Sequence, residues 1–335
     1  MSIPVIAFFN NKGGVGKTSM VYHLSWMFSD RGLRVIAADF DPQSNLTAAF
    51  LEEDRLEQVT DRENHAETVY GAIRPLKDGT GDILVPHMEI VSDRLGLIPG
   101  DMALSTFEDD LSEVWPKCLM GDPRAFRVMS AFWRLAQSAG EKHGADVILV
   151  DLGPNLGAIN RAALIASDFI VIPLGPDLFS LQGLQNLGPV VQTWREGWKD
   201  ILNKNPPADL PLPKGVIKPI GYMVLRHSIR LDRPVKAFDR WMAKMPSTYA
   251  EAVLDKKAKS GVTTDNDPNC IARLRDYRSL MPLAQEARKP MFFLKPADGA
   301  LGAQTHAVNN AYKDFEAVAI KVAKNAGLKC LSQQA

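Results

Sequence analysis

Two lysines and three glycines near the amino terminus have the types and spacing needed to bind phosphate. Residues 11–19 read Asn-Lys-Gly-Gly-Val-Gly-Lys-Thr-Ser and directly follow an apolar run at residues 5–9. Glycine adopts backbone angles that are closed to other residues, so several N–H groups can turn toward phosphate oxygens, and a following helix adds its positive end. The candidate nucleotide-binding residues are Lys12, Gly13, Gly14, Val15, Gly16, Lys17, Thr18 and Ser19.

Within this loop, three side chains have distinct chemistry. The ammonium of Lys17 is placed to reach the β- and γ-phosphates, and the Thr18 hydroxyl is placed to bind Mg²⁺. Asn11 departs from the general pattern, which has glycine there, whereas the variant that begins with a lysine fits at every place. Its extra lysine, Lys12, is a cation that cradling a single nucleotide does not require. A glycine-rich turn that only caps a helix is the alternative interpretation.

Acidic residues end two of the expected strands. Asp151 follows four apolar residues, a position typical of the carboxylate that supports Mg²⁺ opposite a phosphate loop. Asp39 and Asp41 lie two residues apart on an initially extended chain, so both are expected to face the phosphates. Asp41 is then placed to orient or deprotonate the attacking water. The structural alternatives are a cap for Asp151 and a simple Asp-Pro turn for Asp41.

These residues depend on strands that alternate with helices. Continuous apolar runs predict buried parallel strands at residues 34–39, 146–151 and 169–173. Apolar residues at three- and four-residue spacing predict helices at residues 18–30, 124–139, 160–166 and 181–196. The alternation predicts an α/β fold with a doubly wound, mostly parallel sheet flanked by helices. Ligands of such sheets bind beyond the carboxyl ends of the strands, where the loop, residues 39–41 and Asp151 all fall.

Composition bounds the class of protein. The chain has 335 residues, of which 46% are hydrophobic and 23% charged, and these are values of an ordinary globular protein. Three widely separated cysteines form neither a CxxC pair nor a disulfide framework, which favours a reducing compartment. No apolar stretch approaches the ~20 residues that cross a bilayer, and no cationic leader precedes the first strand. A cytoplasmic protein without a membrane partner is therefore expected.

Charge is distributed unevenly, although the formal net charge is zero. Residues 51–115 contain sixteen acidic and five basic residues, whereas residues 214–295 contain seventeen basic and eight acidic ones. One interpretation is a basic face for DNA, and the other is a solvated surface with internal salt bridges. The candidate DNA-binding residues, several of them at helical spacing, are Arg226, Arg230, Arg233, Lys236, Arg240, Lys244, Arg273, Arg275 and Arg278.

The combined pattern resembles the ParA/Soj-type partition ATPases, which are P-loop NTPases of the deviant Walker A type and are related to MinD. The matching segments span nearly the whole chain and are residues 11–18, 39–47, 97–99, 151–157, 162–166, 172–173, 179–184 and 283–290. Where the family usually has Asp-x-Pro-Pro, this chain has Asp151-Leu-Gly-Pro154, which suggests a more flexible loop and a different timing of hydrolysis. Residues 1–335 are interpreted as a single P-loop ATPase domain with surface insertions near residues 115–127, 198–218 and 246–271.

The resemblance implies a role for each site residue. Lys12 would reach across a homodimer to the nucleotide of the second subunit, and Lys17 would bind phosphate in its own subunit. The ATP-bound dimer would bind DNA without sequence preference, and a ParB-like adaptor would stimulate slow hydrolysis of ATP to ADP and phosphate, so that plasmid, chromosome or other cargo is segregated or positioned. The candidate catalytic residues are Lys12, Lys17 and Asp41, and the candidate magnesium residues are Thr18, Asp41 and Asp151.

Other functions were compared with this one. A MinD-type regulator uses a carboxyl-terminal amphipathic helix on membranes, but residues 311–328 lack bulky aromatic residues near their end, which favours a helix packed on the core. The nitrogenase iron protein holds an iron–sulfur cluster with paired cysteines, and no cysteine follows either acidic strand end here. A ParA-like ATP switch that acts through a protein partner, in cargo positioning or defence, remains the alternative function.

Overall fold

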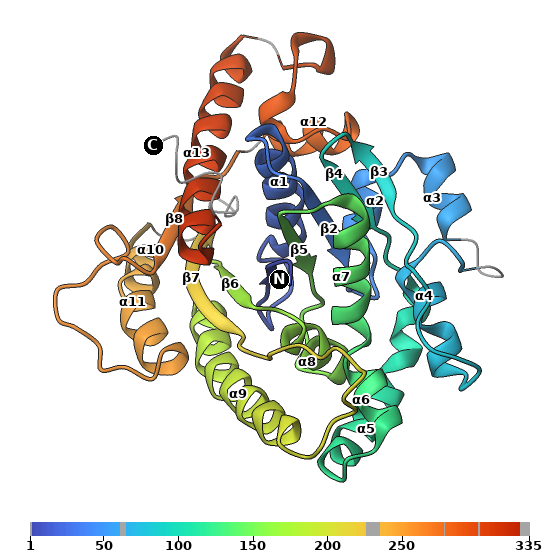
Figure 1. Cartoon of the computed structure of the whole chain (residues 1–335). Coiled ribbons are helices and arrows are strands. Elements are labelled where there is room, and N and C mark those ends of the chain that lie inside the picture. Colours follow the sequence, from blue (N-terminus) through green and yellow to red (C-terminus); the bar gives the residue numbers. More distant parts are fainter. Residues whose placement is uncertain (1, 61–64, 226–234, 278, 301, 329–335) are drawn as a thin grey trace.

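One sheet of eight strands forms the centre of the part of the chain that the structure describes (Figure 1). The structure is a computed structural model, and it describes residues 2–60, 65–225, 235–277, 279–300 and 302–328. The strands are β1 (Val5–Phe8), β2 (Val35–Asp39), β3 (Glu89–Ser92), β4 (Leu95–Ile98), β5 (Val147–Asp151), β6 (Phe169–Leu174), β7 (Lys218–Leu225) and β8 (Cys270–Leu274). Their order is β3-β4-β2-β5-β1-β6-β7-β8, and β3 is antiparallel to β4 whereas the other neighbouring pairs are parallel. The predicted fold class is confirmed.

The central strands are buried on both faces. In β1, Val5 and Ala7 enter one hydrophobic core, whereas Ile6 and Phe8 enter the core on the opposite face. Because helices cover both faces, every position of a central strand excludes water and the sequence is continuously apolar. The strands predicted at residues 34–39, 146–151 and 169–173 are confirmed as β2, β5 and β6, with bounds that differ by no more than one residue.

Helices form the outer layers. They are α1 (Lys17–Asp30), α2 (Asn45–Phe50), α3 (Glu53–Val59), α4 (Val69–Lys77), α5 (Glu108–Leu119), α6 (Pro123–Met129), α7 (Ala131–His143), α8 (Ala158–Ile165), α9 (Leu178–Leu202), α10 (Val235–Met242), α11 (Met245–Thr248), α12 (Leu280–Glu286) and α13 (Ala303–Ala326). Short helical turns are η1 (Met102–Phe107), η2 (Tyr249–Val253), η3 (Met291–Phe293) and η4 (Pro296–Asp298). Helices α1 and α13 bury their apolar side chains in the core on one face, and α4 to α9 bury theirs in the core on the other.

The helix predicted over residues 124–139 is two helices. Helix α6 ends at Met129 and α7 begins at Ala131. Between them, the Ser130 hydroxyl donates a hydrogen bond of 2.7 Å to the carbonyl oxygen of Phe126. Such a bond competes with the helical backbone pattern, so the serine is a natural break point. The other three predicted helices are confirmed as α1, α8 and α9, and α9 extends beyond its predicted bounds at both ends.

Two of the segments interpreted as insertions lie side by side at the end of α9. The ring of Trp115 stacks on that of Trp198, with centroids 6.4 Å apart. The indole nitrogen of Trp198 donates a 2.9 Å hydrogen bond to the carbonyl oxygen of Pro213, so residues 198–218 fold back on their own helix. In the third segment, Asp267 accepts a 2.9 Å hydrogen bond from the Tyr222 hydroxyl of β7. Their role as partner-binding insertions stays a prediction.

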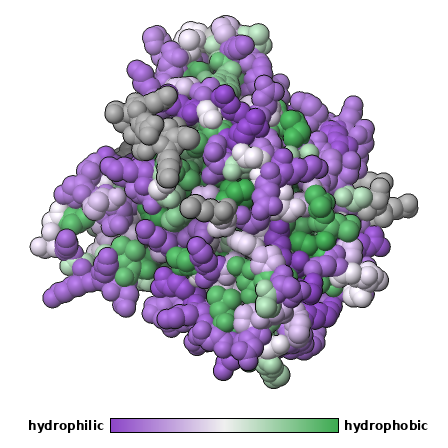
Figure 2. Space-filling model, viewed as in Figure 1, coloured by the Kyte–Doolittle hydropathy of each residue, from purple (hydrophilic) through white to green (hydrophobic). Residues whose placement is uncertain are grey.

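Helix α13 packs against α1, η3 and the strands β7 and β8. Phe315, Val318, Ala319 and Val322 are all buried in the core shared with α1. The predicted packing of this segment on the core is therefore confirmed. Within the described ranges, no helix is both long and apolar enough to cross a bilayer. Figure 2 shows that hydrophilic side chains cover most of the face that it draws, with apolar side chains in scattered groups.

Candidate functional site

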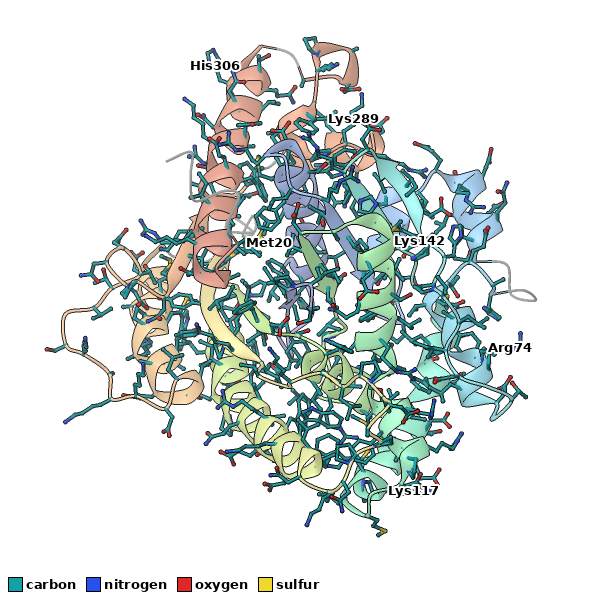
Figure 3. All side chains as sticks on the ribbon, viewed as in Figure 1. Met20, Arg74, Lys117, Lys142, Lys289 and His306 are labelled. Carbon is teal, nitrogen blue, oxygen red and sulfur yellow. The ribbon has the colours of Figure 1, made fainter. Side chains whose placement is uncertain are left out.

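A cavity of about 770 Å³ lies at the carboxyl end of the central strands. The phosphate loop and the first turns of α1 form one wall, and residues after β2 form a second. The third wall comes from the carboxyl-terminal part of the chain, where Met281, Ala284 and Gln285 of α12 and the following Lys289 line the cavity. Figure 3 labels Lys289 near α12. A volume of this size accommodates a small-molecule ligand such as a nucleotide.

The loop has the conformation that its glycines predict. Gly14 and Gly16 have φ angles of 70° and 79°, in the left-handed region that favours glycine, and Gly16 is the residue that caps α1. Of the predicted nucleotide-binding residues, Gly13, Gly14, Gly16, Lys17, Thr18 and Ser19 line the cavity. Val15 is buried, and neither it nor Lys12 contributes to the lining.

Lys17 is a desolvated cation at the start of α1. Its side chain is buried, and its ammonium donates a 3.3 Å hydrogen bond to the carbonyl oxygen of Lys12. Burial lowers the pKa of Lys17, and the negative charges of Asp151 and Asp41 oppose that shift. The lysine is therefore held beside two carboxylates at the edge of the cavity, where a phosphate group would provide a stronger partner.

Asp151 ends β5 as a fully buried carboxylate, behind Thr18 and Lys17 and not in the lining of the cavity. Neither of its oxygens makes a hydrogen bond to the described residues. Burial raises the pKa of Asp151 well above its ordinary value, and the charges of Asp39 and Asp41 raise it further. Thr18 and Lys17 lie close enough to lower that pKa, although they do not satisfy the carboxylate. An unpaired buried carboxylate is costly, and a hard cation with oxygen ligands removes that cost, so the site fits Mg²⁺.

Asp39 has a different role from the one its sequence position suggested. The prediction that it faces the phosphates is wrong, because its fully buried carboxylate is bonded to Thr47 and not to any residue of the phosphate loop. It accepts hydrogen bonds from the backbone N–H and the hydroxyl of Thr47, at 2.8 and 2.7 Å. Burial raises the pKa of Asp39 to about 7. This side chain therefore fastens α2 to the end of β2.

Asp41 lines the cavity as predicted. One of its carboxylate oxygens accepts a 3.0 Å hydrogen bond from the backbone N–H of Gln43, so the turn interpretation also applies. Gly153, at the departure from the family pattern, lies directly beside this carboxylate, and a Cβ atom there would be 3.1 Å from an Asp41 oxygen. The Asn160 side chain donates to the carbonyl oxygens of Gly153 and Asn155 at 2.9 and 2.7 Å, which fixes the loop after β5.

Lys12 points away from the cavity. Its ammonium forms an ion pair of 2.5 Å with Asp177, the residue that caps α9, and it also lies 5.9 Å from the centre of the Phe179 ring. The sequence offered no signal for this contact, since the two residues are 165 positions apart.

The candidate DNA-binding residues do not form one free basic surface in the described part of the chain. Arg273 is ion-paired with Asp265, and Arg275 is ion-paired with Asp314 at 2.9 Å. Arg240 and Lys244 are exposed, and both lie over the ring of Trp241, at 5.1 and 5.6 Å from its centre. Lys236 lies in α10. The predicted residues that lie outside the described ranges are Arg226, Arg230, Arg233 and Arg278.

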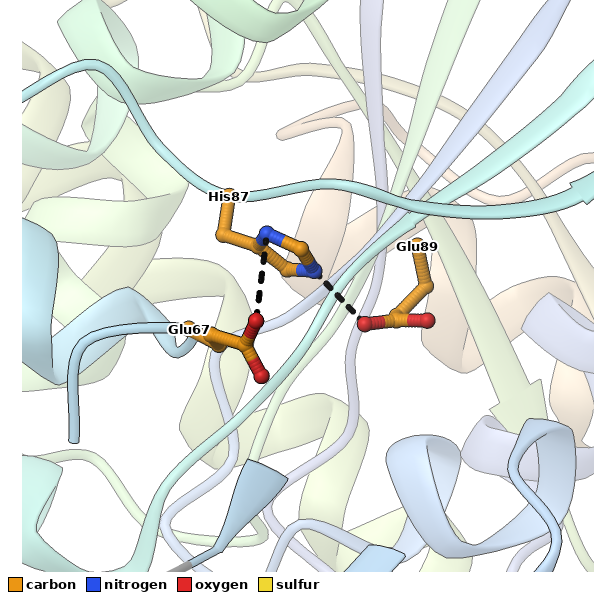
Figure 4. Close-up of side chains that lie close together, drawn as sticks. All are labelled: Glu67, His87 and Glu89. Carbon is orange, nitrogen blue, oxygen red and sulfur yellow. Dashed lines mark hydrogen bonds and ion pairs between the residues drawn. The ribbon is translucent and has the colours of Figure 1, made fainter. Parts of the chain in front are cut away.

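A cluster of Glu67, His87 and Glu89 lies apart from the cavity, at the β3 edge of the sheet (Figure 4). His87 and Glu89 are joined by a 2.6 Å hydrogen bond. The spacing could suit a metal ion, but the Arg55 guanidinium already pairs with Glu89 at 2.5 Å and with Glu67 at 2.8 Å. Because this arginine supplies the positive charge, the cluster is an ion-pair network that ties α3 to β3.

His23 is a cavity residue that the sequence did not single out. It is buried on α1, stacks on Phe315 of α13, and accepts a 3.2 Å hydrogen bond from the backbone N–H of Met291. Its Nδ1 lies 2.7 Å from the carbonyl oxygen of Ser19. Burial lowers the pKa of His23 from 6.5 to about 4, so the neutral imidazole joins the phosphate-loop helix to the carboxyl-terminal wall.

Acid should therefore destabilise the fold through His23. Its stabilising contribution is complete above pH 6.5 and is lost as the pH falls toward 4, because only the unfolded chain accepts a proton in that range. We expect the free-energy difference between the native protein and the His23→Gln variant to shrink by about 3 kcal/mol between pH 7 and pH 4. Urea unfolding of both proteins at several pH values measures this difference in unfolding free energy. Asp39, whose pKa is also raised, contributes equally to both proteins and so does not affect the difference. A difference that does not change with pH would contradict the assignment.

Comparison with known proteins agrees with this geometry. A family model described as an AAA domain matches residues 3–204, more than half of the chain. The sporulation initiation inhibitor protein Soj of Bacillus subtilis is 30% identical over 191 residues, which are 55% of this chain and 62% of Soj. Protein IncC of Escherichia coli is also 30% identical over 191 residues, which are 56% of this chain and 45% of IncC. This chain is a ParA-type partition ATPase by family.

Solved structures share the fold of this chain over most of their length. A protein of Corynebacterium diphtheriae superposes with a TM-score of 0.68 at 25% identity, and the match covers 96% of this chain and 98% of that protein. A plasmid partition protein of Borrelia burgdorferi bound to AMPPNP has a TM-score of 0.59 at 16% identity, with coverages of 96% and 99%. At that identity the second match shows the fold alone.

Among sequence relatives, an uncharacterised protein of Methanocaldococcus jannaschii is 26% identical over 75% of this chain and 84% of its own length.

Proposed function

We propose that this ParA-type chain binds Mg²⁺-ATP in the 770 Å³ cavity and hydrolyses it slowly to ADP and phosphate. The observation that carries the proposal is the buried Asp151 carboxylate, whose oxygens accept no hydrogen bond from the described residues although Thr18 and Lys17 are near enough to lower its pKa. Magnesium, when bound, neutralises phosphate charge and polarises the transferred phosphoryl group. AMPPNP in the related Borrelia protein supports the choice of an adenine nucleotide.

Different residues of the chain would position the phosphates, the cation and the attacking water. The backbone N–H groups of the loop and the Lys17 ammonium bind the phosphates, while Thr18 and Asp151 hold the cation. Asp41 lines the cavity near Gly153 and is the carboxylate that we assign to water positioning, with a supporting role toward the cation. Phosphoryl transfer requires mainly such positioning and charge stabilisation, so no covalent catalyst is needed.

Dimerisation in the ATP state is the second part of the proposal. Leu178 and Phe179 are 41% and 65% exposed at the start of α9, next to Lys12. Exposed apolar side chains next to the phosphate loop suit an interface with a second copy of the chain. Lys12 lies at this surface, from which it can reach a nucleotide that another subunit presents.

The third part is a cycle in which the ATP-bound homodimer binds DNA without sequence preference and a ParB-like adaptor stimulates hydrolysis and release. Family membership and the exposed pair Arg240 and Lys244 around Trp241 support it. We further propose that residues 1–335 act as one ATPase domain, in the cytoplasm and associated with the nucleoid when DNA is bound. The segments near residues 115–127, 198–218 and 246–271 would then bind the adaptor or cargo.

Retention of nonspecific duplex DNA tests this part directly. We expect the protein to bind such DNA with ATP at low salt, and to lose binding steeply as salt rises, because lysines and arginines release counterions from phosphates. Changing both Arg240 and Lys244 to alanine should lower affinity at least tenfold, whereas the Lys199→Ala control on α9 should not. Fluorescence anisotropy with ATP or a slowly hydrolysed analogue measures both. No binding with ATP at low salt would remove the DNA role.

If the protein does not bind DNA with ATP, the alternative function, an ATP switch that acts on a protein partner, would be the better interpretation. The ion pairs of Arg273 and Arg275 favour it, because these arginines are already neutralised within the chain. The two candidates share the same nucleotide site and differ only in what the ATP state holds.

A further inference from the structure

Asp177 uses its two carboxylate oxygens for two different contacts. One oxygen accepts a 3.0 Å hydrogen bond from the backbone N–H of Ser180, which caps the amino terminus of α9. The other oxygen forms the 2.5 Å ion pair with the Lys12 ammonium and accepts a long, 3.5 Å hydrogen bond from the Ser180 hydroxyl. A cap requires only one acceptor, and a neutral asparagine caps a helix as well as an aspartate does. The negative charge of Asp177 interacts favourably with the helix dipole as well, but the ion pair with Lys12 is the one contact that a neutral asparagine cannot make.

We propose that Asp177 is a latch that holds Lys12 within its own subunit and thereby raises the concentration at which two ATP-bound copies associate. This inference rests on the proposed ATP-dependent dimer and assigns the regulation of that same site to a second residue. Asp177 acts through Lys12, so it is a positioning residue and not a catalytic one.

Hydrogen bonds fix the backbone at Lys12, so only its side chain can move. Asn10 donates a 2.7 Å hydrogen bond to the carbonyl oxygen of Pro173 and accepts a 3.0 Å bond from the N–H of Lys12, so the start of the loop is fixed to the end of β6. The lysine side chain can swing on this anchored backbone. In the absence of nucleotide, the Lys12 ammonium pairs with Asp177. A more strongly charged group, such as the triphosphate bound to a second subunit, would compete with Asp177 for this ammonium.

The pair is also weak enough to open. The side chains of Lys12 and Asp177 are 29% and 24% exposed, so water and salt screen their attraction. Phe179 is 65% exposed next to the lysine and does not cover it. An ion pair of this strength shifts the equilibrium between monomer and dimer but does not prevent association. A symmetric dimer breaks two such pairs, so their effect on association is doubled.

The decisive variant is Asp177→Asn, which keeps the cap on Ser180 and removes the charge that holds Lys12. The first measurement is the rate at which an amine-reactive reagent labels Lys12 in the nucleotide-free protein, read by mass spectrometry of the peptide. We expect labelling of Lys12 to be several-fold faster in the variant, while labelling of other lysines stays unchanged and the melting temperature falls by only about 2 °C. The Asp177→Glu variant should restore slow labelling, and Asp200→Asn, an exposed charge change on the same helix, should have no effect.

The second measurement is sedimentation with a slowly hydrolysed ATP analogue. We expect Asp177→Asn to lower the dimer dissociation constant on the order of tenfold, and the double variant with Lys12→Ala to lose this gain. Unchanged or weaker dimerisation of Asp177→Asn would overturn the latch. If the native protein and every variant stay monomeric with ATP, the proposed dimer and its regulation by Asp177 both fall, and the labelling result still decides whether Asp177 holds Lys12.

Discussion

The Lys17→Ala variant should lose nucleotide binding almost completely, with an ATP dissociation constant raised at least 100-fold. The Lys17 ammonium is buried at the start of α1 and is the cation of the loop that lines the cavity next to Asp41 and Asp151. A charge-assisted contact to phosphate in such a desolvated place is worth more than a surface pair, and alanine leaves the charges of Asp41 and Asp151 near the phosphates without compensation. Titration of a fluorescent ATP analogue measures the change.

Lys12→Ala is the matched control, since it removes an equal charge from the same loop. Lys12 does not line the cavity, so this variant should keep nucleotide binding within a few-fold of the native protein. It should instead lose ATP-driven dimerisation, which sedimentation detects. If both variants lost nucleotide binding equally, the separate roles of the two lysines would be wrong.

The Asp151→Asn variant should be more stable than the native protein without ligand and should lose magnesium-dependent function. Its carboxylate is buried and unpartnered beside two other acids, and asparagine removes that charge while keeping the shape. We expect a gain of about 2 kcal/mol, or a rise in melting temperature of about 3 °C for a chain of this length. Without Asp151, magnesium should no longer strengthen ATP binding, and hydrolysis should fall at least 100-fold.

The dependence of this gain on pH identifies its cause. The folded-state pKa of Asp151 is raised, so its carboxyl group favours the folded chain in acid and loses that contribution as the pH rises. The advantage of asparagine should therefore be small near pH 4 and grow toward pH 8 in a buffer without metal. Saturating Mg²⁺-ATP should reverse the order of stability, because only the native protein gains the cation. Calorimetry of both proteins at pH 4 and pH 8, with and without Mg²⁺-ATP, measures their melting temperatures under these four conditions. An equal gain at every pH would point to packing instead of charge.

Local sequence was sufficient for the fold and for most of the phosphate site. The loop glycines, Lys17 and Thr18 are adjacent in the chain, and the strand before them and the helix after them follow from apolar periodicity. Asp151 was predicted to end a strand, and it is the last residue of β5, next to β1 and β2, whose carboxyl ends meet at the same edge of the sheet. Such features depend on spacing that the sequence displays directly.

Asp39 shows where this reasoning fails. Asp39 and Asp41 looked equivalent, but β2 ends at Asp39, and the chain turns at the following residues so that only Asp41 lines the cavity. The buried partner of Asp39 is Thr47, on a helix whose position depends on the packing of α2 against α1 and the sheet. Alternation along a strand gives no information once the strand has ended.

The sequence by itself determined the nucleotide chemistry and the alternating α/β architecture, because both are written in short segments with fixed spacing. Only the tertiary structure decided which charges are already neutralised. It joined Lys12 to Asp177, paired Arg273 and Arg275 with acids, and left Asp151 without a donor. An ion pair acts over a few ångströms in space, whatever the separation along the chain, so charge counts cannot show which cations are free. Lys12 thus begins as an unexplained charge in the sequence, and the fold gives it a partner within its own subunit.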